Sequence, residues 1–188
     1  MKRFTLLFAL LLMVSGSLSA QKALRLYGSY AATDFEEQVE PAQAFGFGAS
    51  FGSQFAALFE AGLEFNMLAQ PWKFESTMDN YTLSTEYTNM MIGAYLKVDI
   101  PLVIIEPYVK GGIGYYMGKV TVNARDLSED YDFKGAMGYS VGAGVDIFLG
   151  LYGEVVYHMV EQEFKDVEDA DPFKYNNFAL NVGWKFSF

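Results

Sequence analysis

The feature that most constrains this chain is an alternation of apolar and polar side chains that recurs in eight segments. In the last segment every second residue from Phe178 to Phe188 is apolar, and the residues between them are small or polar. Successive side chains of a strand point to opposite faces, so each segment predicts a β-strand with one apolar and one polar face. The eight segments lie at residues 24–30, 45–51, 59–67, 89–98, 108–117, 139–147, 154–159 and 178–188.

The links between the segments alternate in length. The links after the first, third, fifth and seventh segments are long and polar, whereas the other three are short. Outer-membrane barrels have long extracellular loops and short periplasmic turns. The pattern therefore predicts an all-β fold, an eight-stranded antiparallel up-and-down transmembrane β-barrel with both termini on the periplasmic side. The long links are residues 34–43, 69–86, 121–134 and 161–175, and the short ones lie around 53–56, 100–106 and 149–151.

The first 20 residues have the composition of a secretory signal peptide. A basic pair precedes an apolar stretch of eleven residues at 4–14, and small residues follow it. The stretch is shorter than the roughly 20 apolar residues of a transmembrane helix. We predict cleavage after Ser19 or Ala20 and a barrel domain of residues 21–188. Loss of the basic pair changes the formal charge from −10 to −12.

Alternation alone does not distinguish a membrane barrel from a soluble lipocalin-like barrel, which places its apolar face inside. Two features of the faces favour the membrane arrangement. Glycine is frequent on the polar face, which suits the narrow interior of eight strands. Aromatic residues on the apolar face collect at the strand ends, as they do in the interfacial girdles of membrane barrels. The predicted girdle comprises Phe51, Phe59, Trp184, Phe186 and Phe188 near the short turns, and Tyr30, Phe45, Tyr115, Tyr139, Tyr157 and Phe178 near the long links.

The charges of the polar face favour the same arrangement, because four cations are matched by four anions. Buried charges are tolerated only when they are paired, so we predict a network of ion pairs inside the lumen. The four long links carry formal charges of −4, −2, −2 and −4, which account for the whole net charge of the mature chain. The predicted lumen network comprises Arg25, Lys97, Lys110 and Lys185 with Glu60, Glu64, Asp146 and Glu154.

Composition excludes several other classes of protein. The chain has no cysteine, which rules out disulfides, cysteine-ligated zinc and c-type haem. Nucleic acid is not an expected partner, because 13 Lys and Arg stand against 23 Asp and Glu. The acidic cluster of Asp166, Glu168, Asp169 and Asp171 has carboxylates that Ca²⁺ accepts, but it lacks the Gly and distal Glu of an EF-hand loop. We expect a solvated loop there, and no metal or cofactor.

Four motifs carry a family resemblance over nearly the whole mature chain. They are Pro-Tyr-Val-Lys-Gly-Gly-Ile-Gly at 107–114, Gly-Ala-Gly-Val-Asp at 142–146, Gly-Glu-Val-Val-Tyr at 153–157, and an aromatic end that finishes at Phe188. They resemble the small outer-membrane β-barrel family that includes the OmpA transmembrane domain and OmpX-like proteins. One departure is Val156, where family members often have Arg.

The resemblance implies residence in the outer membrane of a Gram-negative-type bacterium, in contact with outer-membrane lipid and lipopolysaccharide. It also implies insertion by the barrel-assembly machinery, for which Phe188 resembles the terminal recognition signal. Eight strands leave an interior just filled by side chains, so no open passage is expected. We expect a non-enzymatic structural or surface-interaction (adhesion-like) role, with an extracellular protein as the partner of the acidic loops.

Two alternatives stay open. The first is a narrow pore or carrier for small or apolar solutes. The second is an enzyme that modifies lipid A, as some barrels of this type do, with His158 as the catalytic base. Such a site needs a nucleophile within hydrogen-bond reach of the base. The next inward position is Val160, so the candidate nucleophile is Ser140 on the neighbouring strand.

Overall fold

A computed structural model describes residues 21–34, 43–76, 81–102, 105–124, 127–163, 165 and 173–188. The predicted signal peptide, residues 1–20, lies outside the described residues. Within the described ranges, no helix is long and apolar enough to cross a membrane. The elements are β1 (Lys22–Asp34), β2 (Gln43–Ala56), β3 (Phe59–Ser76), β4 (Tyr81–Asp99), β5 (Ile105–Ala124), β6 (Leu127–Asp132), β7 (Ala136–Ile147), the 3-10 helix η1 (Phe148–Gly150), β8 (Leu151–Gln162) and β9 (Phe173–Ser187).

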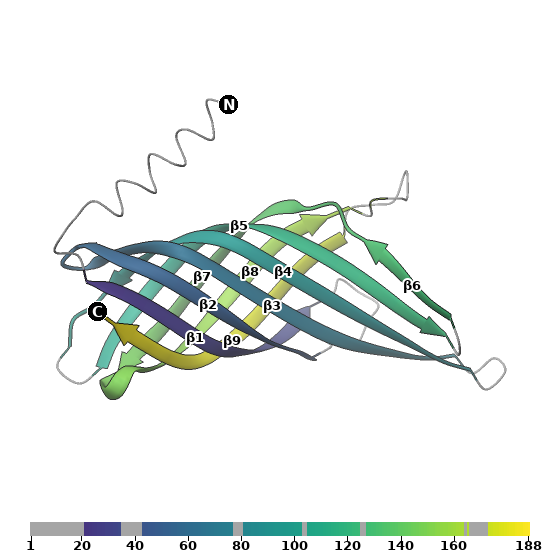
Figure 1. Cartoon of the computed structure of the whole chain (residues 1–188), viewed down its shortest axis with the longest axis horizontal. Helices are drawn as coiled ribbons and strands as arrows, with labels where there is room; N and C mark the ends of the chain where they lie inside the picture. The colour runs from purple at the N-terminus through teal and green to yellow at the C-terminus, as the bar shows by residue number, and fades with distance from the viewer. Residues whose placement is uncertain are drawn as a thin grey trace, which may run out of the picture.

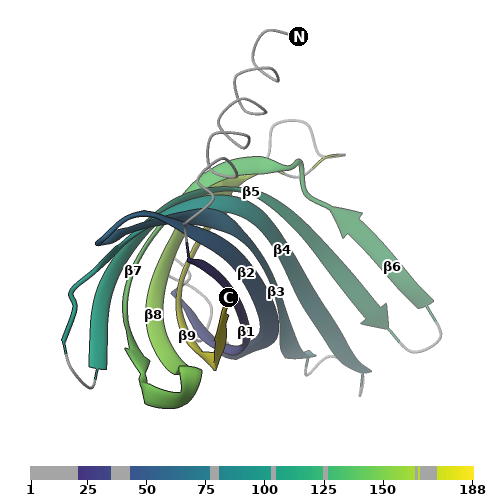
Figure 2. The ribbon, with the colours of Figure 1, turned by 60° about the vertical axis from the view of Figure 1, so that its left-hand side comes forward.

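Eight of these strands form a closed antiparallel ring (Figures 1 and 2). The first and last strands pair from Ala23↔Ser187 to Asp34↔Asn176, and β4 pairs with β5 to complete the circle. Closure leaves no open sheet edge around the ring. The predicted eight-stranded up-and-down barrel is therefore confirmed. We call the end that carries the short turns and Phe188 the turn end, and the opposite end the loop end.

The structure corrects two of the predicted long links. Residues 69–86 are mostly strand, because β3 and β4 stay paired as far as Ser76↔Tyr81. In residues 121–134, β5 continues to Ala124 and pairs there with the additional strand β6. The two hairpins project beyond the ring at the loop end (Figure 2). Apolar alternation marks a strand only where one face is in an apolar environment, so it could not mark these extensions.

The two faces of the ring have opposite character. Along β8 every second side chain from Tyr152 to Gln162 is buried and faces the lumen. The outward side chains include large exposed apolar groups on every side of the ring. This distribution is inverted relative to a lipocalin-like barrel and is the one expected for a barrel surrounded by lipid.

Inward-facing glycines make room for large side chains of the lumen. A Cβ added at Gly48 would lie 2.3 Å from the Tyr27 ring. A Cβ added at Gly183 would lie 2.1 Å from the backbone oxygen of Leu26 and 2.7 Å from the Cα of Tyr27. Gly183 therefore allows β9 and β1 to approach closely at the seam that joins the two ends of the barrel.

This packing predicts unequal effects for two glycine variants at the same seam. Gly183→Ala should lower the free energy of unfolding by about 1–3 kcal/mol, because the added methyl group overpacks against backbone. Gly28→Ala is the matched control: Gly28 pairs with Val182 of β9, yet an added Cβ meets nothing within 4 Å. Its effect should stay within about 0.5 kcal/mol. Urea unfolding in phospholipid vesicles measures both, and equal losses would contradict the packing argument.

Candidate functional site

The lumen holds all eight charged residues that the sequence assigns to the inner face. Seven are buried, and the Lys185 side chain is the most accessible at 18%. They lie in two groups that are stacked along the barrel. The turn-side group contains Arg25, Glu60, Lys97, Asp146 and Lys185, and the central group contains Glu64, Lys110 and Glu154.

The turn-side group is organised around the Asp146 carboxylate of β7. Its Oδ2 lies 2.6 Å from Lys185 Nζ, 3.0 Å from Lys97 Nζ and 3.5 Å from Arg25 Nη2. Arg25 also forms a two-point hydrogen bond with Glu60, in which Nη2 donates to Oε2 at 2.9 Å. Fork-shaped Arg–carboxylate pairs are both strong and directional. Three cations on three strands are thus held by two carboxylates.

Two residues that the sequence analysis left out of the network extend this group at the turn end. Asp99 forms an ion pair with Lys97, and its backbone N–H donates to the Leu58 carbonyl at 2.8 Å. Glu106 lies 3.8 Å from Lys185 Nζ with half of its side chain exposed. Their positions beside the short turns gave no indication of which lysine they would reach.

The five residues of the turn-side group include one more cation than carboxylates. The central group instead has one more carboxylate than cations, because one ammonium lies between two carboxylates. Lys110 Nζ is 3.1 Å from Glu64 Oε1 and 2.8 Å from Glu154 Oε1. The hydroxyl of Tyr27 donates to Glu64 at 2.7 Å, and that of Tyr108 donates to Glu154 at 3.0 Å. These two hydroxyls stabilise the pair of carboxylates, which share one ammonium, without adding charge. The eight residues therefore balance only when the two groups are taken together.

Neutral polar side chains extend each of the two charged groups. Asn181 donates to Glu154 at 3.0 Å, Ser29 donates to Asn181 at 2.6 Å, and Asn66 donates to Ser29 at 3.1 Å. Tyr95 donates to Glu60 at 2.6 Å in the turn-side group. Alternation alone predicts that these residues face inward, but it does not predict their hydrogen-bond partners.

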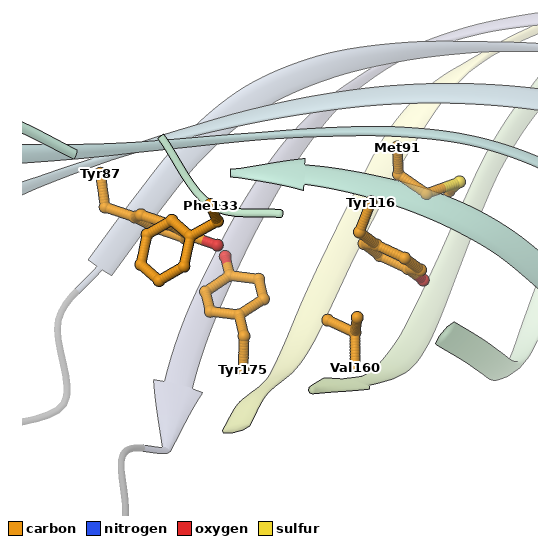
Figure 3. Packing of buried hydrophobic residues seen from close by; sticks show 6 residues of the cluster. All are labelled: Tyr87, Met91, Tyr116, Phe133, Val160 and Tyr175. Carbon is orange, nitrogen blue, oxygen red and sulfur yellow. The ribbon is translucent and has the colours of Figure 1, made fainter. Parts of the chain in front are cut away.

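An aromatic layer lies between the central group and the loop end (Figure 3). The rings of Tyr87 and Tyr175 are 5.0 Å apart, and the Phe133 ring is 5.6 Å from Tyr87. The backbone N–H of Phe133 donates to the Gly118 carbonyl at 2.9 Å, which turns the link after β6 back into the barrel. The sequence analysis placed Phe133 and Tyr175 in loops, so this layer is a correction. Its members are Tyr87, Met91, Tyr116, Phe133, Val160 and Tyr175.

His158 lies beneath this layer, fully inside the lumen. Its Nδ1 is 2.9 Å from the Tyr116 hydroxyl, and its imidazole is buried. Ser140 is its register partner on β7. The cavity beside the ring has a volume of about 10 Å³, which is roughly the space of one water molecule.

The predicted girdle residues all point outward and are exposed or half-buried. Tyr30 pairs with Phe45 toward the loop end, where their rings are 5.3 Å apart. At the turn end the rings of Phe51 and Phe188 are 6.5 Å apart. The remaining turn-end members are Phe59, Trp184 and Phe186, and the remaining loop-end members are Tyr115, Tyr139, Tyr157 and Phe178.

Phe188 is tied to the first strand. Its backbone N–H donates to the Lys22 carbonyl and the Lys22 N–H donates back to its carbonyl, both at 3.0 Å. Phe188 thus completes the β1–β9 seam, and its role as an assembly signal stays a prediction.

The acidic cluster at 166–171, where the sequence offers carboxylates for Ca²⁺, lies outside the described residues. In the part of the chain that is described, no group of three or more His, Cys, Asp and Glu is placed to hold a metal ion.

Comparison with known proteins points to one kind of protein. A family model described as outer membrane protein beta-barrel domain matches residues 4–186. Among solved structures, Neisserial surface protein A aligns at 12% identity with a TM-score of 0.62, over 89% of this chain and 97% of that one. OprG of Pseudomonas aeruginosa aligns at 12% identity with a TM-score of 0.59, over 90% and 96%.

A third similar structure is the attachment invasion locus protein Ail of Yersinia pestis, solved in complex with the heparin analogue sucrose octasulfate. It aligns at 14% identity with a TM-score of 0.56, over 90% of this chain and 100% of that one. At such identities these likenesses show the fold. No curated protein matches the sequence significantly.

The network predicts that two lysines of the same strand differ sharply in importance. Lys110→Met leaves Glu64 and Glu154 buried without their cation, which should cost about 3–5 kcal/mol of unfolding free energy. Lys119→Met on the same strand removes a half-exposed pair with Asp130, and should cost much less than Lys110→Met because solvent screens an exposed pair. Equilibrium unfolding in vesicles compares the two variants, and similar losses would show that the central group is not stabilised by pairing.

Proposed function

Because the chain belongs to the family of outer membrane protein beta-barrel domains, we propose that it is a closed, non-enzymatic barrel whose acidic loop end contacts partners outside the cell. Family membership places the protein in the outer membrane of a Gram-negative bacterium. The observation that carries the proposal is the filling of the lumen by two ion-paired groups and an aromatic layer. The long hairpins and acidic links supply the surface that remains for function.

The filled lumen favours closure over a pore or carrier. A polar solute would have to displace charged side chains such as Lys110. In its ion pairs with Glu64 and Glu154, both partners are buried. Breaking a buried pair costs several kcal/mol, because the remaining charge is left without a partner. An apolar solute would meet the same charged groups below the aromatic layer. Neither class of solute finds a compatible path along the whole lumen.

The proposal that the barrel lacks enzymatic activity rests on the surroundings of His158. A lipid A-modifying site must be reached from the membrane or the cell surface, but this imidazole is 3% exposed and faces the lumen. Its Nδ1 is engaged with the Tyr116 hydroxyl. The adjacent space admits no acyl chain or sugar, so a role in packing and hydrogen bonding fits His158 better than catalysis.

We place the loop end outside the cell and both termini in the periplasm. Barrels of this class have long extracellular loops and short periplasmic turns. Here the turns at residues 57–58 and 148–150 lie at the same end as Phe188. The β3–β4 and β5–β6 hairpins project from the other end (Figure 1).

The outer surface in this orientation is acidic. The exposed strand β6 carries Glu129, Asp130 and Asp132. A hydrogen bond from Lys119, and a smaller contribution from one donated by Thr121, lower the pKa of Asp130. This carboxyl therefore stays ionised at neutral pH. A partner with a basic surface is attracted to such a face, whereas a polyanion is repelled. We therefore do not propose that this chain binds a polyanion like the heparin analogue in the Ail structure.

Binding to a fluorescent oligolysine peptide tests this choice of partner chemistry. Protein in nanodiscs should bind the peptide with an affinity that falls as salt is added. The variant Glu129→Gln/Asp130→Asn/Asp132→Asn should lower the affinity about tenfold, since three exposed charges that attract the peptide are removed together. Glu106→Gln at the turn end is the control and should bind as the unmodified protein does. Preferential binding of heparin, or an unchanged affinity in the triple variant, would overturn the proposal.

A further inference from the structure

A groove of about 740 Å³ lies on the outside of the barrel near the loop end. Its floor is formed by outward side chains of β4 and β5, and its wall by the link between β6 and β7 together with Lys165. A volume of this size is typical of sites that hold a lipid or another drug-sized molecule. Most of its lining faces outward, but Phe133 of the aromatic layer and Asp132 of the acidic strand β6 also line the groove.

The floor of the groove changes from apolar to polar within one step of the β4–β5 ladder. Met90 pairs with Met117, and the next outward pair toward the loop end is Thr88 with Lys119. Such a change on a lipid-facing wall marks the level of the lipid headgroups. The groove therefore spans the boundary between acyl chains and headgroups.

Three lysines lie around the polar part of the groove, together with one acidic residue, Asp132. Lys119 Nζ is 2.7 Å from Asp130, and Lys134 Nζ is 2.9 Å from Glu163. About half of each of these side chains is exposed, so the pairs contribute little and an incoming anion can replace them.

The third lysine, Lys165, is exposed and has no ion-pair partner among the residues that the structure describes. Its backbone N–H donates to the Asp132 carbonyl at 3.1 Å, and the Lys134 N–H donates to the Glu163 carbonyl at 2.7 Å. These two backbone hydrogen bonds hold Lys134 beside Glu163 and Lys165 beside Asp132.

The apolar part of the groove is closed on one side by Tyr115. A Cβ added at Gly135 would lie 1.9 Å from the Tyr115 hydroxyl oxygen, so the phenol lies directly against the link that carries Lys134. Tyrosine is enriched at the headgroup level of membranes, where its ring is in apolar surroundings and its hydroxyl is hydrated. The groove therefore combines an apolar channel, an interfacial tyrosine and a cluster of ammonium groups.

We propose that this groove binds the phosphorylated glycolipid of the outer leaflet, lipopolysaccharide, through its lipid A part. An acyl chain lies along Met90 and Met117, and a phosphate group is held by Lys119, Lys134 and Lys165. The lining itself has three lysines and one carboxylate, and the phosphate would replace Asp130 and Glu163 as the partners of Lys119 and Lys134. The assignment to the outer leaflet rests on the orientation given under the proposed function, whereas the site itself depends only on the groove.

Native mass spectrometry of the folded protein in detergent micelles, titrated with bis-phosphorylated lipid A, tests the site. The variant Lys134→Gln/Lys165→Gln should weaken lipid A binding at least tenfold. Lys22→Gln/Lys174→Gln removes the same charge outside the groove and should stay within about twofold of the unmodified protein. Dephosphorylated lipid A should bind equally weakly to all three proteins. The heat-modifiable electrophoretic mobility of the barrel confirms that each variant is folded.

Three results would overturn the proposal. They are an equal loss in both double variants, equal binding of lipid A with and without phosphate, and a preference for phosphatidylglycerol over lipid A, which would assign the groove to a phospholipid. The titration does not depend on closure of the lumen, and its lysine variants leave Glu129, Asp130 and Asp132 unchanged. Loss of oligolysine binding with intact lipid A binding, or the reverse, therefore distinguishes failure of the proposed function from failure of this site.

Discussion

The pairing of charges inside a closed ring is the constraint on which the rest of this structure depends. A charge that is buried in the lumen is costly unless it is satisfied, and here the charged side chains pair with one another. The pairs join strands that are not neighbours in the ring: Arg25 of β1 reaches Glu60 of β3, and Lys97 of β4 reaches Asp146 of β7. The network thus fixes the distances across the barrel, while the ladders fix the distances around it.

The two charged groups are satisfied in different ways. In the turn-side group the three cations are paired with Asp146 and Glu60 and, at the turn end, with Asp99 and Glu106. In the central group one ammonium, that of Lys110, lies between two carboxylates. Tyr27 donates a hydrogen bond to Glu64 and Tyr108 donates one to Glu154, and glycines of adjacent strands give these two rings room. The same tyrosines therefore fill space in the lumen and stabilise its buried charges. The acid that is not paired inside is displayed at the loop end, where it is available for contact with other molecules.

The eight strands of the ring and the side that their residues face were predictable, because alternation with a period of two is a local property of the sequence; the additional strand β6 was not. That local rule assigned Lys110 and Glu154 to the lumen. It could not predict that they meet, because partners across a barrel depend on the tilt and stagger of the strands. It also missed Phe133 and Tyr175, which lie in polar stretches without alternation but turn back into the barrel. The hairpin extension at Ser76↔Tyr81 was missed for a related reason, since beyond the lipid the strands need no apolar face.

The central claim, a lumen closed by paired and packed side chains, is tested most directly by thiol accessibility. The chain has no cysteine, so Ser29→Cys places a single thiol in the lumen, where the serine is 5% exposed. Ser187→Cys places one at the exposed turn end of β9 as the matched control. In folded protein in bilayers, a small hydrophilic methanethiosulfonate should modify the thiol of Ser187→Cys rapidly and that of Ser29→Cys only after unfolding in urea. Modification of both variants at similar rates in the folded state would show an open lumen and contradict the account.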